Sequence, residues 1–328
     1  MSGEFAMEKK FIITIDTEGD NLWAWKQGDA IRTENTLYLQ RFQDLCNRYG
    51  FRPVWLSNYE MLSDSRYVDF ICRVEEEGTG ELGMHLHAWS TPPEYNLQVL
   101  RSGAPYLIEY PTEVMEEKIA AMTDLIRQRT GITPVSHRAG RWAMDGRYFD
   151  LLVKYGYLAD CSVTPHVNWQ ANVGATEHSQ GSDYSACPET PYWISNSAGT
   201  GRILEVPMSI RKMGGLVFEN ADSLRGIARG FKNITKEKTV WLRPNGGNLG
   251  ALQKLQRRIA REESTDYLMF MIHSSELMPG GSPTFPTEAS IEKLYQTMET
   301  LFAGIAKTYR GETLRDYAIS RQGKDTAL

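Results

Sequence analysis

Apolar and polar positions divide the chain into two kinds of segment. Short, nearly all-apolar runs such as Phe11 to Ile15 are typical of strands that are buried on both faces of a sheet. Longer segments such as residues 34–49 repeat apolar residues at the three- and four-residue spacing of a helix. The pattern predicts strands at 11–15, 53–56, 81–87, 135–138, 157–163, 203–207 and 267–273, and helices at 34–49, 66–77, 113–129, 145–155 and 287–305.

This alternation of strands and helices implies a parallel sheet, because parallel strands need a crossover connection that is usually helical. With about seven expected strands, an open sheet and a closed barrel both fit. Residues 165–200 are rich in Ser, Asn, Gly, Thr and Pro, so we expect a long loop there on the functional face. We expect residues 1–6 to be a vector-derived leader and residues 7–328 to form a single domain.

Composition excludes some classes of function. The net charge of −5, without a basic stripe, argues against a nucleic-acid-binding protein. No stretch approaches the roughly 18 apolar residues that a membrane-spanning helix needs. The four cysteines form no C-x-x-C pair, which fits a reducing compartment. Because no signal peptide precedes the first strand, we expect a cytoplasmic location.

Two pairs of possible metal ligands lie at strand ends, each at a spacing of two residues. Asp16 and Glu18 follow the first strand directly, and His85 and His87 end the strand at 81–87. Residues two apart on a strand share one face, so each pair can point at a single spot. Carboxylates and imidazoles grouped in this way are typical of a catalytic divalent metal site. Taken alone, Asp16 could also be an ordinary turn residue.

Two further residues extend this candidate site. Arg138 ends another expected strand, and an arginine there can hold Asp16 in its ionised state, although a purely structural ion pair is an equal alternative. His273 ends a buried strand, where a histidine can act as a general acid or base. The chain has no G-x-S-x-G, G-x-G-x-x-G or Walker motif, so a serine-hydrolase mechanism and a nucleotide cofactor have no support.

Taken in order, these clusters resemble the polysaccharide deacetylases with the NodB homology domain, carbohydrate esterase family 4. The resemblance covers about residues 10–310 and implies a distorted (β/α) barrel of about seven parallel strands. The five ordered motifs of the family match Asp16 with Glu18, His85 after Glu81-Leu82-Gly83, Arg138 to Trp142, Asp160 to Pro165, and His273.

The chain departs from the usual motifs at three places. Thr17 separates the two acidic residues of the first motif, which are usually adjacent. The histidines of the second motif are usually four residues apart, but here Trp89 takes the usual second position and His87 is the nearest alternative. Ala139 and Gly140 stand where the third motif usually has prolines. This combination is similar to the WalW-type wall and capsule deacetylases.

The resemblance implies a metal-dependent hydrolase that removes an N-acetyl group from an amino sugar of a polysaccharide or its precursor. The expected ion is divalent, with zinc favoured, and the expected partner is an N-acetylated glycan or glycan precursor. A glycan-binding protein without catalysis and a C–N hydrolase of a small amide or ureide are the alternatives. The implied roles are metal binding by Glu18, His85 and His87, general base for Asp16, general acid for His273, orientation of Asp16 by Arg138 and of His273 by Asp160, and substrate binding by Arg141 and Trp142, with Trp169 as a further aromatic that could stack on a sugar.

Overall fold

The computed structural model describes residues 8–26, 28–98, 100–101, 103–214 and 237–325, so the expected leader at residues 1–6 lies outside the described ranges. The strands are β1 (Lys9–Thr17), β2 (Val54–Ser57), β3 (Glu81–Leu86), β4 (Ser136–Ala139), β5 (Ala159–Asp160), β6 (Tyr192–Ser195), β7 (Arg202–Glu205), β8 (Ile210–Met213), β9 (Lys238–Trp241), β10 (Tyr267–His273) and β11 (Tyr309–Gly311). The helices are α1 (Leu39–Arg48), α2 (Tyr59–Ser63), α3 (Ser65–Glu76), α4 (Thr112–Thr130), α5 (Gly146–Lys154), α7 (Leu249–Ile259), α8 (Glu288–Ile305) and α9 (Leu314–Asp325), with short 3-10 turns at Glu34–Tyr38, Leu107–Glu109, Gly140–Trp142 and Ser274–Leu277.

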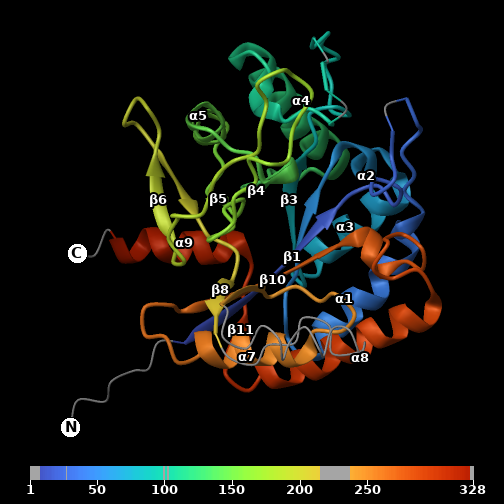
Figure 1. The fold of residues 1–328 in the computed structure, drawn as a ribbon, viewed down its shortest axis with the longest axis vertical. Coiled ribbons are helices and arrows are strands. Elements are labelled where there is room, and N and C mark those ends of the chain that lie inside the picture. Colours follow the sequence, from blue (N-terminus) through green and yellow to red (C-terminus); the bar gives the residue numbers. More distant parts are fainter. Residues whose placement is uncertain (1–7, 27, 99, 102, 215–236, 326–328) are drawn as a thin grey trace.

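One curled sheet organises the fold (Figure 1). Within the described residues it has nine strands in the order β10-β1-β2-β3-β4-β5-β7-β6, and β11 also pairs with β1. Every pairing is parallel except that of β6 with β7, which is antiparallel. A separate antiparallel pair is formed by β8 and β9. The curled, mostly parallel sheet with its surrounding helices confirms the expected distorted (β/α) barrel.

The two faces of the sheet bury different sets of side chains. On β1, Phe11, Ile13 and Ile15 belong to the large core that also contains the inner faces of α1, α3, α4, α7 and α8. The intervening Ile12 points to the interior of the curled sheet, where it joins Met269 of β10 and Tyr317 of α9 in a smaller core. The same alternation places Thr14 and Asp16 on the interior face.

Helix α9 accounts for much of this second core. It contributes Leu314, Tyr317 and Ala318, all of them buried. Two polar side chains at the base of the interior are tied to the same helix: Glu81 accepts a hydrogen bond from the backbone N–H of Arg315, at 2.9 Å, and Asp266 accepts one from the Tyr317 hydroxyl, at 2.6 Å. The base of the barrel is therefore filled, which leaves the carboxyl ends of the strands as the open end.

Several expected elements differ from the structure. The expected loop at 165–200 contains β6, because Tyr192-Trp193-Ile194 favours an extended backbone and pairs with β7. The strand expected at 157–163 is only Ala159–Asp160, since the Ser162 hydroxyl takes the Ala139 N–H at 2.8 Å and ends the ladder. Two elements that the pattern does not predict, β11 and α9, follow the helix at 288–305. No helix within the described ranges is both long and apolar enough to cross a membrane.

Candidate active site

Strand register brings the predicted residues together at the open end of the sheet. Asp16 of β1 lies directly beside His273 of β10, and His85 of β3 lies directly beside Arg138 of β4. Strand β2 separates the two pairs, but it ends at Ser57, level with Thr17 and Met84. Beyond that level no strand of the described part of the chain lies between β1 and β3, so residues that follow can face each other across the gap.

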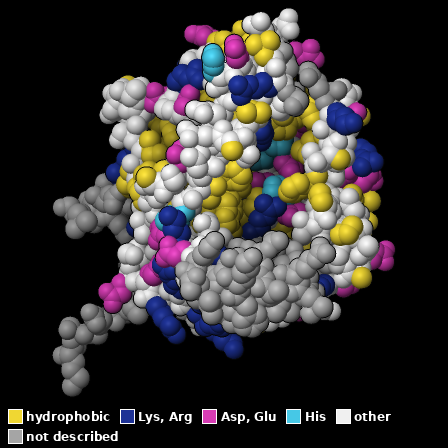
Figure 2. Space-filling model, in the orientation of Figure 1, with side chains coloured by type: hydrophobic (Ala, Val, Ile, Leu, Met, Phe, Trp, Pro, Cys, Tyr) yellow, Lys and Arg dark blue, Asp and Glu magenta, His cyan; other side chains and the backbone are white. Residues whose placement is uncertain are grey.

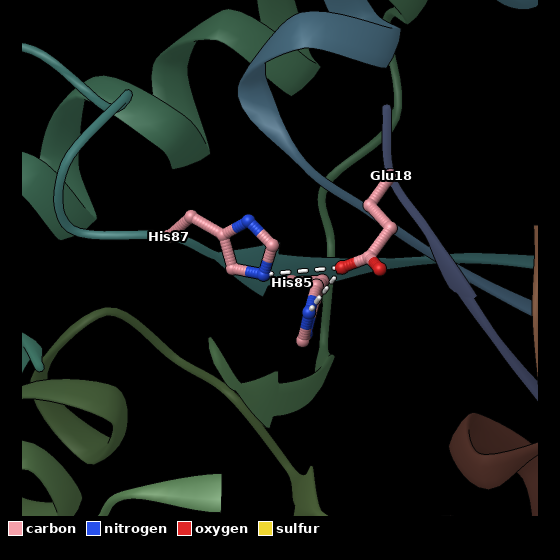
Figure 3. A group of neighbouring side chains, drawn as sticks. All are labelled: Glu18, His85 and His87. Atoms are coloured by element: carbon pink, nitrogen blue, oxygen red, sulfur yellow. Dashed lines mark ion pairs between the residues drawn. The ribbon is translucent and has the colours of Figure 1, made fainter. Parts of the chain in front are cut away.

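Glu18, His85 and His87 meet in this gap (Figure 3). Oε2 of Glu18 lies 3.2 Å from Nε2 of His87 and 3.6 Å from Nε2 of His85. All three side chains are buried, and one ligand atom from each lies within 4.8 Å of the others. One carboxylate with two imidazoles is a set of ligands that catalytic zinc sites use.

Three features of the cluster fit a divalent metal. Tetrahedral coordination with bonds of about 2.1 Å places two ligand atoms about 3.4 Å apart, close to both observed distances from Glu18. Nδ1 of His85 lies 3.0 Å from the Arg138 carbonyl oxygen, and a proton on Nδ1 leaves the Nε2 lone pair free to bind an ion. Burial alone lowers the pKa of His85, but Asp16 and Glu18 outweigh it and raise that pKa, so this spot favours positive charge.

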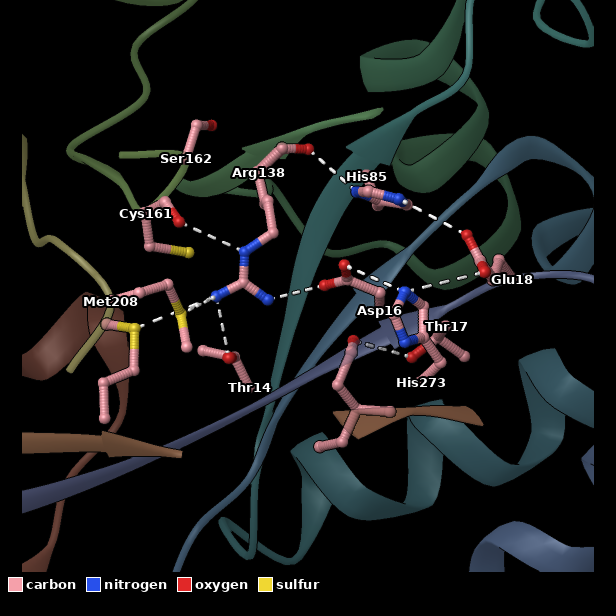
Figure 4. Close-up of polar contacts among 12 residues, drawn as sticks. Thr14, Asp16, Thr17, Glu18, His85, Arg138, Cys161, Ser162, Met208 and His273 are labelled. Atoms are coloured by element: carbon pink, nitrogen blue, oxygen red, sulfur yellow. Dashed lines mark hydrogen bonds and ion pairs between the residues drawn. The ribbon is translucent and has the colours of Figure 1, made fainter. Parts of the chain in front are cut away.

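Asp16 and Arg138 form a buried ion pair beside the cluster (Figure 4). Nη1 of Arg138 donates to Oδ1 of Asp16 at 2.5 Å, Nη2 donates to the Thr14 hydroxyl at 2.8 Å, and Nε donates to the Cys161 carbonyl at 3.1 Å. Burial would raise the pKa of Asp16, but Arg138, followed by His85 and His273, holds it below its usual value. Asp16 is therefore a carboxylate whose second oxygen, Oδ2, is free of the arginine.

His273 faces both carboxylates from the neighbouring strand β10. Its Nε2 lies 3.8 Å from Oδ2 of Asp16 and 3.9 Å from Oε1 of Glu18. Its Nδ1 lies 3.2 Å from Oε2 of Glu276 and 3.0 Å from Nη2 of Arg243. Glu276 also accepts hydrogen bonds from the His273 backbone N–H, at 2.9 Å, and from Arg243, at 3.0 Å. Burial would raise the pKa of Glu276, but Arg243 and His273 hold it below its usual value.

The role expected for Asp160 is wrong: Asp160 does not orient His273. Its Oδ1 lies 2.5 Å from Nδ1 of His137 and accepts a hydrogen bond from the Ser162 hydroxyl at 2.9 Å. The neighbours of Asp160 in sequence, Ala159 and Cys161, pack inside the barrel, so Asp160 points to the opposite face of the sheet. There the His137 ring also contacts the Tyr148 hydroxyl of α5, at 2.8 Å.

Arg141 and Trp142 line the cavity and have left-handed backbone conformations. Their φ angles of 55° and 63° lie in the left-handed region, which costs side chains of this size about 1–3 kcal/mol each. Arg141 is held by the Ala104 and Val173 carbonyls and lies 4.0 Å from the Tyr106 ring centroid. The Trp142 carbonyl accepts a hydrogen bond from the Tyr184 hydroxyl at 2.5 Å. The Trp142 ring lies nearly parallel to the Trp169 ring, with centroids 6.5 Å apart. These contacts hold both side chains at the cavity wall.

Gly140, which precedes this pair, lies against the metal-binding strand. A Cβ atom there would lie 2.4 Å from the Leu86 carbonyl oxygen and 2.6 Å from Cδ2 of His87. Both distances are too short for a side chain, so glycine lets the turn pack directly on the His87 ring. The His87 ring also stacks on Trp89, with centroids 4.3 Å apart.

The candidate metal ligands line one cavity of about 380 Å³ together with Asp16, His273, Arg141 and Trp142. Figure 2 shows the hollow, with histidine and acidic side chains inside it and hydrophobic side chains on its wall. Trp23 lies edge-on to His273, with centroids 5.2 Å apart, and its indole N–H donates to Ser275 at 3.1 Å. Of the residues predicted from sequence, the structure brings together Asp16, Glu18, His85, His87, Arg138, Arg141, Trp142 and His273 and leaves Asp160 apart.

Three residues of the site were not predicted from the sequence: Glu276, Arg243 and Trp23. A signal for Glu276 exists, because it lies three residues after His273 in a turn that would bring it back to the histidine. Arg243 follows β9, a strand outside the main sheet, so its sequence neighbourhood gives no hint of its position. Trp23 lies in the segment after the first acidic pair and carries no periodic pattern.

Comparison with known proteins identifies the fold. No model of a known protein family matches the sequence, and no curated protein matches it. A Mycobacterium smegmatis protein assigned to the polysaccharide deacetylases matches over 97% of this chain and 92% of its own, with a TM-score of 0.53 and 13% identity. A Pseudomonas aeruginosa PAO1 protein with the same assignment gives a TM-score of 0.50 at 13% identity, over 94% and 88% of the two chains. An allantoinase gives 0.51 at 14% identity, again over 94% and 88%. The chain shares the fold of these proteins, and a shared fold leaves the activity open.

Proposed function

We propose that this protein is a metal-dependent hydrolase that removes an N-acetyl group from an amino sugar of a polysaccharide or its precursor. The observation that carries the proposal is the convergence of three metal-type ligands, a carboxylate held by arginine and a histidine in one cavity. Structural neighbours assigned to the polysaccharide deacetylases support it at the level of fold. The close spacing of His85 and His87 supports placement in a WalW-type branch.

Glu18, His85 and His87 would hold the ion, with zinc as the expected metal. When bound, a divalent ion supplies Lewis-acid polarisation of the acetyl carbonyl and makes water more acidic. Asp16 accepts the proton of the attacking water at Oδ2, since Arg138 occupies Oδ1. The Asp16 carboxylate stays ionised because its buried partner, Arg138, is a cation.

His273 completes the reaction by giving a proton from Nε2 to the leaving nitrogen. When His273 is protonated, its Nδ1–H donates to Oε2 of Glu276, Arg243 donates to Oε1 of the same carboxylate, and Nε2 faces the cavity. The C–N bond breaks, and the products are the free amine and acetic acid, which ionises to acetate and a proton released to solvent. Asp16 then holds the proton taken from water, and His273 has lost one. A single water molecule bridging the 3.8 Å between Oδ2 and Nε2 would carry the proton from Asp16 back to His273 and restore both groups. Arg141 and Trp142 are placed to contact the sugar.

The proposal is tested by metal content and acetate release measured on the same samples. The chain is stripped of metal, reloaded with zinc and incubated with N-acetylglucosamine oligosaccharides. We expect about one ion per chain and release of acetate, and loss of both in His85→Ala. His178→Ala is the matched control, because the His178 side chain is 93% exposed and does not line the cavity. Zinc binding without acetate release would favour a glycan-binding protein instead.

A ureide hydrolase is the second candidate, because an allantoinase has the same fold and a TM-score of 0.51. Such an enzyme also breaks a C–N bond, and the same acid and base would serve it. The two candidates differ in the size of the substrate. Zinc-loaded protein that hydrolyses allantoin but releases no acetate from any N-acetylated sugar would favour this second function.

A further inference from the structure

A second, larger cavity adjoins the catalytic one. Its volume is about 750 Å³, and it shares Trp25, Trp89 and Ala104 with the catalytic cavity. The indoles of Trp25 and Trp89 lie 29° from parallel with centroids 6.1 Å apart, and Trp89 stacks on the candidate metal ligand His87. The two cavities therefore meet at these two rings, which belong to the lining of both.

The charged lining of the second cavity is mostly cationic. Lys26, Arg101 and Lys118 contribute positive charges, and Glu94 contributes a negative one. Lys118 is 2% exposed, and its ammonium group donates to the Thr91 and Pro93 carbonyls at 2.5 and 2.6 Å. An ammonium group has three donors, so one remains for a ligand. Burial lowers the pKa of Lys118 to about 8, and a bound anion would favour its charged form.

The wall next to Lys118 carries polar groups that the protein leaves unsatisfied. Within the described part of the chain, Trp89 Nε1, Ser90 Oγ and Thr91 Oγ1 are buried without a hydrogen-bond partner, and all three residues line the second cavity. Thr91 as a whole is only 2% exposed. Buried polar groups are normally paired, so a run of three such groups on one wall indicates a place where a polar ligand completes the bonding. Tyr95 and Tyr110 add aromatic surface on which a sugar ring can pack.

We propose that the second cavity binds the unit of the substrate next to the reacting amino sugar, and that this unit carries an anionic group. This inference rests on the proposed function and narrows its substrate class to acidic N-acetylated glycans or their precursors. The anion is either a carboxylate on the neighbouring sugar or the phosphate of an activated precursor. Lys26, Arg101 and Lys118 recognise the charge common to both, and the unpaired groups at residues 89–91 bind hydroxyls.

Three substrates test the inference: neutral N-acetylchitotetraose, a tetrasaccharide of alternating N-acetylglucosamine and glucuronate, and uridine diphosphate N-acetylglucosamine. We expect kcat/KM for acetate release to be at least tenfold higher with one of the acidic compounds than with the neutral one. A preference for the tetrasaccharide assigns the site to carboxylates, and a preference for the nucleotide sugar assigns it to phosphates. Equal kcat/KM for all three compounds would overturn the inference.

The double variant Lys26→Gln/Arg101→Gln removes two of the charges at exposed positions, so the fold should be retained. We expect it to lower kcat/KM for the preferred acidic substrate at least fivefold more than for the neutral one. Arg129→Gln is the matched control, since Arg129 is exposed on α4 and does not line either cavity. An equal loss on both substrates, or none on either, contradicts the proposed role of the charges.

Failure of the proposed function gives a different result from failure of this inference. If the zinc-loaded protein releases acetate from none of the three compounds, the proposed function fails. The same compounds are then titrated into wild type and the double variant by calorimetry. Tighter binding of an acidic compound, weakened at least fivefold in the double variant, still supports an anion-binding cavity. Equal binding of all three compounds, or no binding, refutes it.

Discussion

Replacing Asp16 by Asn separates the proposed base from the proposed metal ligands. The change keeps the size of the side chain and an oxygen that can accept the Arg138 hydrogen bond, but removes the negative charge. A general base typically contributes 10²- to 10⁴-fold to a rate, so we expect acetate release to fall by at least about 100-fold. The three metal-type ligands are untouched, so zinc content should stay near one ion per chain.

The same substitution also carries a cost in stability. Arg138 is fully buried, and Asp16 is its charged partner. Breaking a buried ion pair lowers the free energy of unfolding by about 3–5 kcal/mol. Because Asn can keep the hydrogen bond to Arg138, we expect Asp16→Asn to lie near the lower end of this range, at about 3 kcal/mol. Urea unfolding measures this loss, and the activity assay is run where the variant remains folded.

Asp20→Asn serves as the matched control. Asp20 is also a buried acid near the end of β1, but it accepts the Glu34 backbone N–H at 2.7 Å and does not line the catalytic cavity. It should keep activity within a few-fold of wild type. Loss of zinc in Asp16→Asn would mean that Asp16 is a ligand, and near-normal acetate release would mean that it is not the base. Either result refutes the assignment.

Four further outcomes are expected. Glu276→Gln should lower kcat about 10- to 100-fold with zinc content unchanged, because the carboxylate positions the ring of His273. His273→Ala should lower turnover more strongly without unfolding the protein, as circular dichroism would check. Gly140→Ala should weaken zinc affinity, measured by competition with a chelator, because the new Cβ displaces His87. Burial raises the pKa of Glu81 to about 7 from its usual 4.5, so folding stability should fall by about 3 kcal/mol between pH 4.5 and 7, and Glu81→Gln should remove that slope in urea unfolding.

Much of the site was predictable from strand geometry alone. Asp16 and His273 end two apolar strands, and parallel strands end at the same edge, so their proximity follows once the strands are recognised. The spacing of two residues likewise predicts that His85 and His87 share a face. The pairing of Arg138 with Asp16 spans two intervening strands. It therefore depends on the order of strands in the sheet, which the local sequence pattern does not contain.

The error over Asp160 has a physical cause in the same rule of alternation. A residue at a strand end can point to either face, and for the two-residue strand β5 the sequence gives no alternation long enough to show which. Its neighbours Ala159 and Cys161 are small and fit the crowded interior, which turns Asp160 outward to His137. The place that Asp160 was expected to fill beside His273 belongs to Glu276, whose position is set by a tight turn rather than by a strand. Alternation therefore identifies the groups that strands bring to the cavity, whereas Glu276, which orients His273, comes from a turn whose course depends on the folded chain.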